Sequence, residues 1–252
     1  MSDNPVVVLI SGVSRGIGRG FAEAYLSRPN HTVIGSIRDD ASPEVAELRA
    51  FEPAEGSKLI LIHIESTEPE DAAKAIKGIK ATGIRYIDIA IANAGGSPPI
   101  QSMDSVSASS MVAAFEVNAV GPLLLFQACK SLLKASKRKP KWVSISTGGG
   151  SISLIGEIRS YIGPAYGASK AALNWLTAAF HHENDWLISV ALHPGLVQTA
   201  PGNWLARKFG MERAPYTIEY SVKQMMKIID EASKEQTSGK FIRAVGGGEM
   251  NW

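Results

Sequence analysis

The sequence predicts a single α/β domain, a doubly wound parallel sheet with helices on both faces in three α/β/α layers. Short runs rich in β-branched residues alternate along the chain with longer segments of helical periodicity. Most of the short runs are apolar throughout rather than alternating, as strands buried on both faces must be. Repeated strand–helix units joined by right-handed crossovers build such a sheet. No internal repeat, low-complexity tract or linker divides residues 1–252.

The individual elements follow from these patterns in chain order. Strands are expected at Val6–Ser11, Thr32–Ser36, Lys58–Ile64, Ile87–Ala92, Lys141–Ser146, Ile188–Leu192 and Phe241–Ala244. Helices are expected over Gly18–Ser27, Pro69–Ile79, Ser109–Ser136, Tyr166–Asn184 and Ile218–Ala232. Two loops, 147–164 and 199–216, interrupt the alternation directly after expected strands. Open α/β sheets bind ligands at the carboxyl ends of their strands, so both loops are expected to border a site.

Charge and hydropathy exclude several classes of partner. The 26 basic and 24 acidic side chains leave a net charge of only +2, and the basic run KASKRKPK at 134–141 is short enough to be a solvated helix end. We therefore expect no nucleic-acid partner. The N-terminal apolar run is too short for a signal peptide or a membrane span, and no later segment approaches transmembrane length. These features predict a soluble, cytoplasmic protein without a membrane partner.

Cysteine and histidine usage argues against a disulfide framework and a metal site. Cys129 is the single cysteine, and its place in the apolar run LLLFQACKSLL predicts a small buried residue. The five histidines show no metal-ligand spacing with one another or with Cys129, so no metal is expected.

The first strand leads into a glycine-rich turn and a helix, in the stretch VVVLISGVSRGIGRGFAEAYL. Gly12, Gly16 and Gly18 are spaced as GxxxGxG. Glycines permit the tight turn and let the backbone approach a diphosphate, whose charge is then met by the helix N-terminus. A glycine triplet that follows a buried strand and opens a helix has the context of a dinucleotide-binding loop.

Five motifs in chain order resemble those of the classical short-chain dehydrogenase/reductases, a Rossmann-type family. SGVSRGIG is similar to the family's TGxxxGIG, with Ser11 in place of the threonine. The others are ANAG at 92–95 for NNAG, Asn118 for the helical asparagine, Tyr166–Lys170 for YxxxK, and PGLVQT at 194–199 for PGxVxT. The resemblance covers the whole chain. At a finer level, RGIGRGFAEAYLSRPN, LLLFQACK and FHHENDWL resemble the norsolorinic acid ketoreductases of fungal aromatic polyketide pathways and, more distantly, sniffer-type carbonyl reductases.

Tyr166 and Lys170 are four residues apart, a spacing that places two side chains on one helix face. A free phenol has a pKa of about 10, and a cation within ~4–6 Å favours the phenolate. The resemblance implies that Tyr166 is the general acid that protonates the substrate carbonyl and that Lys170 also binds the nicotinamide ribose. Tyr161 lies beyond a Gly-Pro pair and is expected to be a substrate-side aromatic or a surface residue.

Asn118 lies in an apolar helical stretch, MVAAFEVNAVGPLLLFQA, where an asparagine needs a reason. Pro122 follows four residues later and has no N–H, so the carbonyl of Asn118 loses its helical partner and can hold an ordered water. The resemblance implies that this carbonyl and water extend a proton relay from Lys170 to solvent.

The hydroxyl that orients the substrate carbonyl is ambiguous in this sequence. The family has a serine at the end of the fifth strand, and WVSISTGGGSI places Thr147 there with Ser146 one residue earlier. Alternate strand side chains face opposite ways, so only one of the two reaches the site. The gap to Tyr166 is longer than in most members, which leaves Ser151 or Ser153 as alternatives. We favour Thr147.

The resemblance also implies an NADP(H) site. Arg38 follows the second strand, where an NAD enzyme usually has a carboxylate for the ribose, and Arg15 adds a second cation. Asp39 and Asp40 fall past the expected contact. Further contacts are implied for Ser14, Ile17, Glu65, Ser66, Asn93, Ala94, Gly95, Pro194, Gly195, Val197 and, at the carboxamide, Thr199.

The late loop 199–216 is expected to cover the substrate. Trp204, Leu205 and Phe209 would form an apolar wall that suits a bulky or polycyclic ketone, although they could instead pack a lid on the sheet. We expect an NADPH-dependent ketoreductase of secondary metabolism or carbonyl detoxification. The alternative is a non-redox protein that binds the cofactor as scaffold, sensor or cyclisation template. The resemblance implies a homodimer or homotetramer formed through the helices near Ser109 and Tyr166.

Overall fold

Eight strands form one sheet in the computed structural model, which describes residues 4–252. Their order across the sheet is β3-β2-β1-β4-β5-β6-β7-β8, and all neighbours are parallel except the β7–β8 pair. The strands are β1 Val6–Ile10, β2 His31–Ile37, β3 Lys58–His63, β4 Ile89–Ala92, β5 Lys141–Ile145, β6 Ile188–His193, β7 Phe241–Arg243 and β8 Glu249–Met250. The direction of winding reverses between β1 and β4, and that switch point is where such sheets bind ligands.

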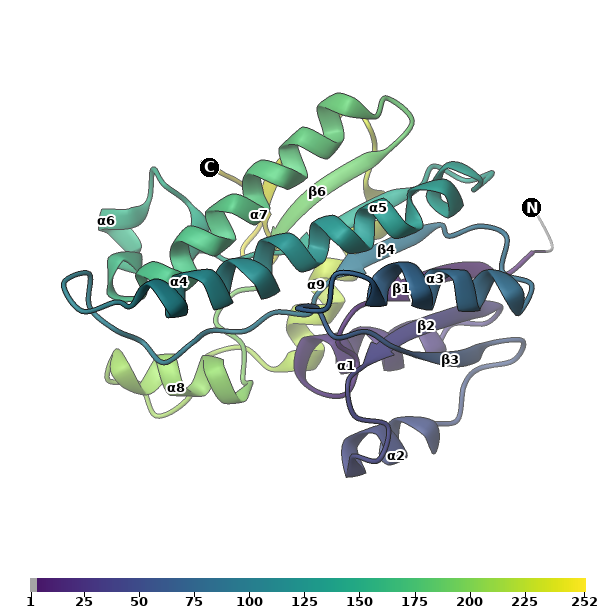
Figure 1. Cartoon of the computed structure of the whole chain (residues 1–252), viewed down its shortest axis with the longest axis horizontal. Helices are drawn as coiled ribbons and strands as arrows, with labels where there is room; N and C mark the ends of the chain where they lie inside the picture. Colours follow the sequence, from purple (N-terminus) through teal and green to yellow (C-terminus); the bar gives the residue numbers. More distant parts are fainter. Residues whose placement is uncertain (1–3) are drawn as a thin grey trace.

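Helices cover both faces of the sheet (Figure 1). They are α1 Gly16–Leu26, α2 Pro43–Arg49, α3 Asp71–Ala81, α4 Ala108–Phe115, α5 Gly121–Lys134, α6 Ile155–Ile158, α7 Pro164–Glu183, α8 Ala200–Lys208 and α9 Ile218–Glu231. One core cluster packs α1 and α9 on the sheet through Phe21 and Met225, and a second packs α3, α5 and α7 on the other face through Ile76, Phe126 and Phe180. The predicted three-layer doubly wound fold is confirmed.

All seven expected strands are present, and their ends shift by at most two residues, as from Ile87 to Ile89 in β4. The long helix expected over Ser109–Ser136 is also present, but a π-helical turn at Glu116–Val120 divides it into α4 and α5. The expectation that 199–216 is a loop was wrong in part, because its first half forms α8. The hydroxyl of Thr199 caps that helix by accepting from the backbone N of Gly202 at 3.1 Å.

The expectation that no segment approaches transmembrane length was also wrong. The continuous helical run Ala108–Lys134 is long and apolar enough to cross a membrane by length and composition. In this fold its α5 half lies over the sheet, where Leu125, Phe126 and Leu133 are buried among side chains of α3 and α7. The apolar side chains of α5 that face the sheet are therefore used within the domain, whereas Val112 and Val120 of the same run are exposed.

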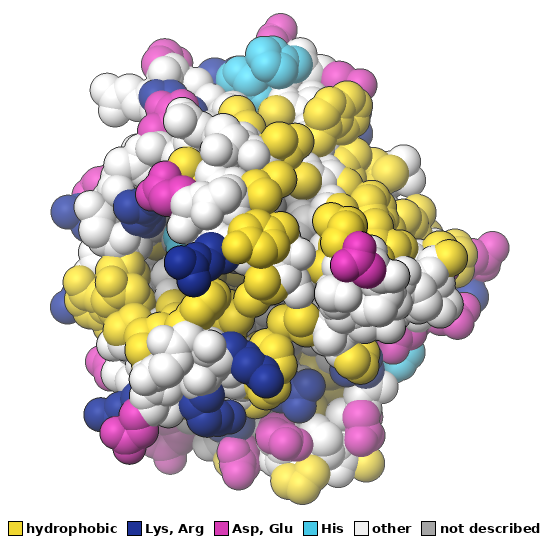
Figure 2. All heavy atoms as spheres, turned by 90° about the vertical axis from the view of Figure 1, so that its left-hand side faces the viewer, with side chains coloured by type: hydrophobic (Ala, Val, Ile, Leu, Met, Phe, Trp, Pro, Cys, Tyr) yellow, Lys and Arg dark blue, Asp and Glu magenta, His cyan; other side chains and the backbone are white. Residues whose placement is uncertain are grey.

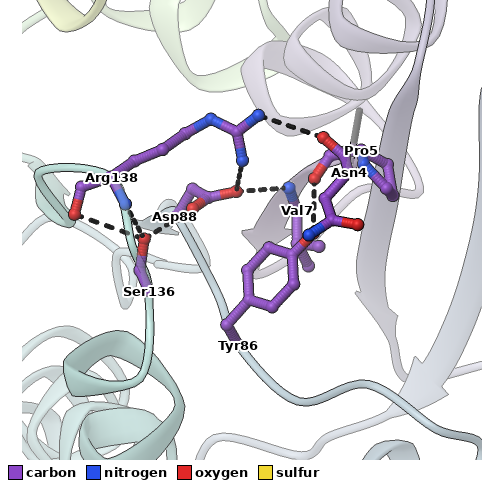
Figure 3. A network of polar contacts seen from close by, with 7 residues as sticks. All are labelled: Asn4, Pro5, Val7, Tyr86, Asp88, Ser136 and Arg138. Atoms are coloured by element: carbon purple, nitrogen blue, oxygen red, sulfur yellow. Dashed lines mark hydrogen bonds and ion pairs between the residues drawn. The ribbon is translucent and has the colours of Figure 1, made fainter. Parts of the chain in front are cut away.

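Part of the basic run at 134–141 is built into the structure rather than solvated. Arg138 pairs with the buried carboxylate of Asp88 at 3.3 Å, and Lys141 donates to the last carbonyls of α9 at Ile229 and Asp230. Asp88 also accepts from the backbone N of Val7 at 2.9 Å and from Ser136 Oγ at 2.6 Å (Figure 3). This network ties β1, β4 and the end of α5 together at the amino edge of the sheet, remote from the site described below.

Cys129 is fully buried in α5, as expected, and burial raises the pKa of its thiol to about 12. Such a thiol stays protonated and acts as a small apolar residue.

Candidate active site

The glycine-rich loop after β1 is locked against the loop after β4. Ser11 Oγ accepts hydrogen bonds from the backbone N of Asn93 at 3.0 Å and of Ala94 at 2.9 Å. In return, Asn93 Nδ2 donates to the carbonyls of Ser11 at 2.9 Å and Gly12 at 3.1 Å. The serine that replaces the family's threonine therefore has the hydroxyl that this junction requires.

Three glycines are needed in that loop for different reasons. Gly12 and Gly16 have φ values of 73° and 63°, the left-handed region that favours glycine. A Cβ on Gly18 would lie 2.1 Å from the carbonyl oxygen of Gly12. The first turn of α1 carries no acidic residue and its N-cap, Arg15, makes no side-chain cap, so the N–H groups there are available to an anion.

The segment PGLVQT lies across from this loop. The nearest atom to a Cβ built on Gly16 would be Cγ2 of Thr199, at 3.6 Å. Gly195 has a φ of 85°, and the carbonyl of Pro194 accepts from Ser221 Oγ at 2.7 Å, which fixes the turn at the end of β6. Val197 is buried. The two motifs thus approach one another at Gly16 and Thr199, and Ser14 and Ile17 of the first motif are half-buried.

Two arginines border the outer end of the loop. Arg15 is exposed, and no ion pair is found for it among residues 4–252. Arg38 follows β2 with 68% of its side chain exposed, and its guanidinium lies 3.6 Å from the carboxylate of Glu65. Asp39 instead accepts from the backbone N of Ala41 at 3.0 Å.

The second aspartate, Asp40, pairs with Arg49 at 2.5 Å. Asp39 and Asp40 are the two carboxylates that count against an NADP site. Both are therefore engaged by groups outside the glycine-rich loop. Ser66 packs against the start of α5, since a Cβ on Gly121 would lie 2.9 Å from the Cβ of Ser66.

Tyr166 and Lys170 lie one turn apart on α7. Lys170 is 4% exposed, its Nζ donates to the carbonyl of Ile145 at 2.9 Å, and it lies 5.9 Å from the centroid of the Tyr166 ring. Burial raises the pKa of Tyr166 to about 12 and lowers that of Lys170 to about 8. The sequence argument expected the cation to favour the phenolate, but burial of both groups outweighs that effect here. The raised pKa also makes the phenol a weaker acid than a free tyrosine.

Asn118 lies within the π-helical turn and is fully buried. Its Oδ1 accepts from the backbone N of Gly96 at 3.0 Å, while its Nδ2 donates to the carbonyl of Gly96 at 2.7 Å and to Ser169 Oγ at 3.0 Å. A Cβ on Gly95 would lie 2.9 Å from Asn118 Oδ1 and 3.3 Å from Lys170 Nζ. The side chain thus joins the β4 loop to α7, a role that the sequence did not indicate. The free carbonyl and its water stay a prediction.

Ser146 and Thr147 diverge at the end of β5. Ser146 is buried and its Oγ donates to Asn174 Oδ1 of α7 at 2.5 Å. Thr147 is half-buried and caps a 3-10 turn, Gly148–Gly150, with its Oγ1 accepting from the backbone N of Gly149 at 3.2 Å. Ser151 donates to the carbonyl of Asn251 at 2.7 Å and lies 3.2 Å from Ser153 Oγ, so both loop serines are engaged at the C-terminal segment.

Exposed or half-buried apolar side chains lie at the end of the molecule that carries α6, α8 and the start of α7. Tyr161, Trp204 and Phe209 are 51%, 39% and 46% exposed, and Leu205 is half-buried. Tyr161 lies just before α7, and the other three lie on or next to α8, which anchors itself through the buried Ala206. Figure 2 shows the face that includes α6 and α8, with hydrophobic side chains spread around a hollow and basic side chains between them.

Sequence reasoning missed one wall of this site. A small cavity at Tyr166 is lined by residues 97–101, Val106 and 163–165. The buried Oε1 of Gln101 has no hydrogen-bond partner there among residues 4–252. The signal was the run SPPIQS after ANAG, which is proline-rich and follows the carboxyl end of β4.

Among residues 4–252, no group of three or more histidine, cysteine, aspartate or glutamate side chains could hold a metal ion.

Comparison with known proteins identifies the family. The family model for short chain dehydrogenases matches residues 6–207. The short-chain dehydrogenase srdF of Neurospora crassa is 53% identical over 249 residues, which cover 98% of this chain and 97% of that protein. The norsolorinic acid ketoreductase of Aspergillus parasiticus is 38% identical and covers 98% of this chain and 91% of its own. The structure of an NADPH-bound carbonyl reductase from chicken fatty liver superposes with a TM-score of 0.87 at 28% identity and covers 100% of this chain and 96% of its own. The chain belongs to the short-chain dehydrogenase/reductase family of oxidoreductases.

Proposed function

We propose that this protein is an NADPH-dependent ketoreductase that acts on a carbonyl of a bulky, aromatic or polyketide-type substrate. The observation that carries the proposal is the close approach of three segments at Gly95. Asn93 bonds the segment 93–95 to the glycine-rich loop, and Gly95 lies against the side chains of Asn118 and Lys170. Lys170 is one helical turn from Tyr166. A proton donor, a cation and a phosphate-binding loop are thereby brought to one edge of the sheet.

The residues present fit a dinucleotide cofactor. The uncapped N-terminus of α1 and the glycine cradle suit a diphosphate, and Arg15 and Arg38 suit a ribose 2′-phosphate. When bound, NADPH supplies a hydride from its nicotinamide ring. The remaining contacts would come from Ser14, Ile17, Glu65, Ser66, Asn93, Ala94, Gly95, Pro194, Gly195, Val197 and Thr199, with Lys170 at the nicotinamide ribose. The NADPH named for the chicken carbonyl reductase supports the same cofactor here.

The chemistry that the chain itself supplies is proton transfer and orientation. Tyr166 donates the proton to the carbonyl oxygen, since a tyrosine phenol carries its proton at neutral pH. The Oγ1 of Thr147 already accepts from the backbone N of Gly149, which leaves its single O–H free to donate to the same oxygen. The side chain of Asn118 holds the loop after β4 against α7. Its backbone carbonyl would hold a water that connects Lys170 to solvent for proton transfer.

The substrate class is supported by exposed aromatic side chains at the end of the molecule that carries α6 and α8. Exposed aromatic side chains at Tyr161, Trp204 and Phe209 offer flat apolar area to a polycyclic ketone, whereas a small hydroxy acid would leave them wet. The ketoreductase named among the relatives, from a fungus, supports a ketone of secondary metabolism.

The test is a screen of NADPH oxidation, followed by absorbance, against aromatic ketones, quinones and small aliphatic ketones. We expect turnover with bulky aromatic carbonyls and little with small ones. NADPH binding without turnover of any carbonyl would instead favour the non-redox alternative, in which the fold is a scaffold, sensor or cyclisation template.

Arg38→Ala should weaken NADPH binding and leave NADH binding nearly unchanged. Loss of a charge-assisted contact to the 2′-phosphate should raise the Kd for NADPH roughly ten- to a hundredfold. Arg15→Ala should act in the same direction. Arg49→Ala is the matched control, because this exposed arginine pairs with Asp40 instead. Fluorescence titration measures all three, and an unaltered Kd in Arg38→Ala would place the phosphate elsewhere.

We further propose a homodimer formed through α4, α5 and α7. Trp175 on α7 is 71% exposed, Val112 on α4 is 56% exposed, and Val120 before α5 is 43% exposed. Exposed large apolar side chains on neighbouring helices are typical of an interface.

Trp175→Glu should convert the dimer to a monomer in analytical ultracentrifugation, since a carboxylate would be buried without a partner at the interface. Tyr220→Glu on α9, where the side chain is 46% exposed on the opposite face of the sheet, should keep the dimer. An unchanged sedimentation coefficient for Trp175→Glu would place any interface elsewhere.

A further inference from the structure

The turn that carries Thr147 is packed directly on the backbone of α7. A Cβ on Gly150 would lie 2.8 Å from the carbonyl carbon of Lys170, and a Cβ on Gly167 would lie 3.0 Å from the carbonyl oxygen of Gly149. No side chain fits between the turn and the helix at either position. The Thr147 turn and the helix that carries Tyr166 and Lys170 are therefore in direct backbone contact, which helps to set their relative placement.

One buried side chain bonds to both ends of this turn. Asn174 lies one helical turn beyond Lys170 on α7 and is 3% exposed. Its Oδ1 accepts from Ser146 Oγ at 2.5 Å, and its Nδ2 donates to the carbonyl of Gly150 at 3.1 Å. Ser146 directly precedes Thr147, and Gly150 is the last residue of the turn that Thr147 caps.

The two bonds constrain the turn in different ways. The bond from Ser146 holds the end of β5, whereas the bond to Gly150 holds the turn itself against the helix. Both are buried, so neither can be replaced by water without cost. A carboxamide is suited to this place because it can accept at one atom and donate at the other.

We infer that Asn174 is a positioning residue for carbonyl reduction, which holds the Thr147 turn at a fixed place relative to Tyr166. This inference rests on the proposed role of Thr147. Asn174 reaches the reaction only through the turn, so its loss should lower kcat and leave cofactor binding intact. A small displacement of a reacting group can cost up to about 10²-fold in rate, and we expect a loss of about 10- to 10²-fold in kcat.

Two variants separate this role from stability alone. Asn174→Leu keeps the volume but removes both hydrogen bonds. Asn174→Asp keeps the acceptor for Ser146 but, when ionised, opposes the carbonyl of Gly150. Burial raises the pKa of such a carboxyl group, and its protonated form can donate to Gly150 again. The kcat of Asn174→Asp relative to wild type should therefore rise as pH falls, while that of Asn174→Leu should not.

The matched controls are buried polar side chains that lie away from the turn. The hydroxyls of Thr177 on α7 and Ser144 on β5 are hydrogen-bonded at 2.7 Å, so Thr177→Val removes a tether between the same helix and strand. Asn184 at the end of α7 donates to the carbonyl of Phe180 at 3.0 Å and is 2% exposed, so Asn184→Asp is the carboxylate control. Both should lower Tm by amounts similar to the Asn174 variants yet keep kcat.

A double-mutant cycle on single-turnover hydride transfer gives the decisive result. In a Thr147→Val background, Asn174→Leu should cause no further loss, because the hydroxyl that it positions is gone. A full additional loss in that background, or a wild-type kcat for both Asn174 variants, would overturn the inference while the proposed function stands. Wild-type hydride transfer by Thr147→Val itself would remove the role of Thr147 and this inference with it.

Discussion

Tyr166→Phe should abolish carbonyl reduction and leave NADPH binding nearly intact. The ring keeps its place on α7, so packing and cofactor contacts survive, but the proton that the carbonyl oxygen needs is no longer supplied. General acids typically contribute a factor of about 10²–10⁴ in rate, so kcat should decrease by at least about 10²-fold. Steady-state kinetics and a fluorescence titration of NADPH measure the two quantities separately.

Tyr161→Phe is the matched control for this variant. Tyr161 is 51% exposed and lies in the short 3-10 turn Ser160–Ile162 before α7, so the loss of its hydroxyl should be mild. A kcat for Tyr166→Phe within about threefold of wild type would remove Tyr166 from the proton transfer. Equal losses in the two variants would assign the acid to neither residue alone.

The framework of the fold could be predicted because its strands are continuously apolar. Runs such as Val6–Ile10 and Ile89–Ala92 are buried on both faces, so composition alone identifies them. The helix α2 was not predicted, although Ser42 and Pro43 give it a cap and a first residue, because its seven residues contribute only Val45 and Leu48 to the core. Short helices give too few apolar residues for their period to be read.

Motif positions at the site could be predicted, but the contacts that assemble them could not. The glycine spacing predicted the cradle, and Gly18 does lie against the carbonyl of Gly12. The side chain of Asn118 bonds across the fold to Gly96 and Ser169, which are 22 and 51 residues away in sequence. No local pattern indicates such partners. The balance between charge and burial at Tyr166 was misjudged for the same reason, since burial is a property of the folded chain.

The ambiguous pair at the end of β5 illustrates the same limit, and the structure now separates its two members. Ser146 Oγ is directed at Asn174, whereas Thr147 Oγ1 stands at the start of the turn that faces α7. Threonine can make the same hydrogen bond as serine, so Thr147→Ser should retain most of the activity. Thr147→Val keeps the shape without the donor, and loss of one such donor typically lowers kcat by about 10²–10³.

Ser146→Ala should behave differently from Thr147→Val because its hydroxyl serves the fold. It leaves Asn174 Oδ1 without its donor in a buried place, so Tm should fall. Hydride transfer should stay within about threefold of wild type, because the bond from Asn174 Nδ2 to Gly150 still holds the Thr147 turn. Single-turnover hydride transfer at saturating NADPH compares the two variants directly. A crippled Ser146→Ala beside an active Thr147→Val would mean that the strand register at the site is displaced by one residue. If both variants react normally, the carbonyl oxygen is held by neither hydroxyl, and Tyr166 alone would have to orient and protonate it.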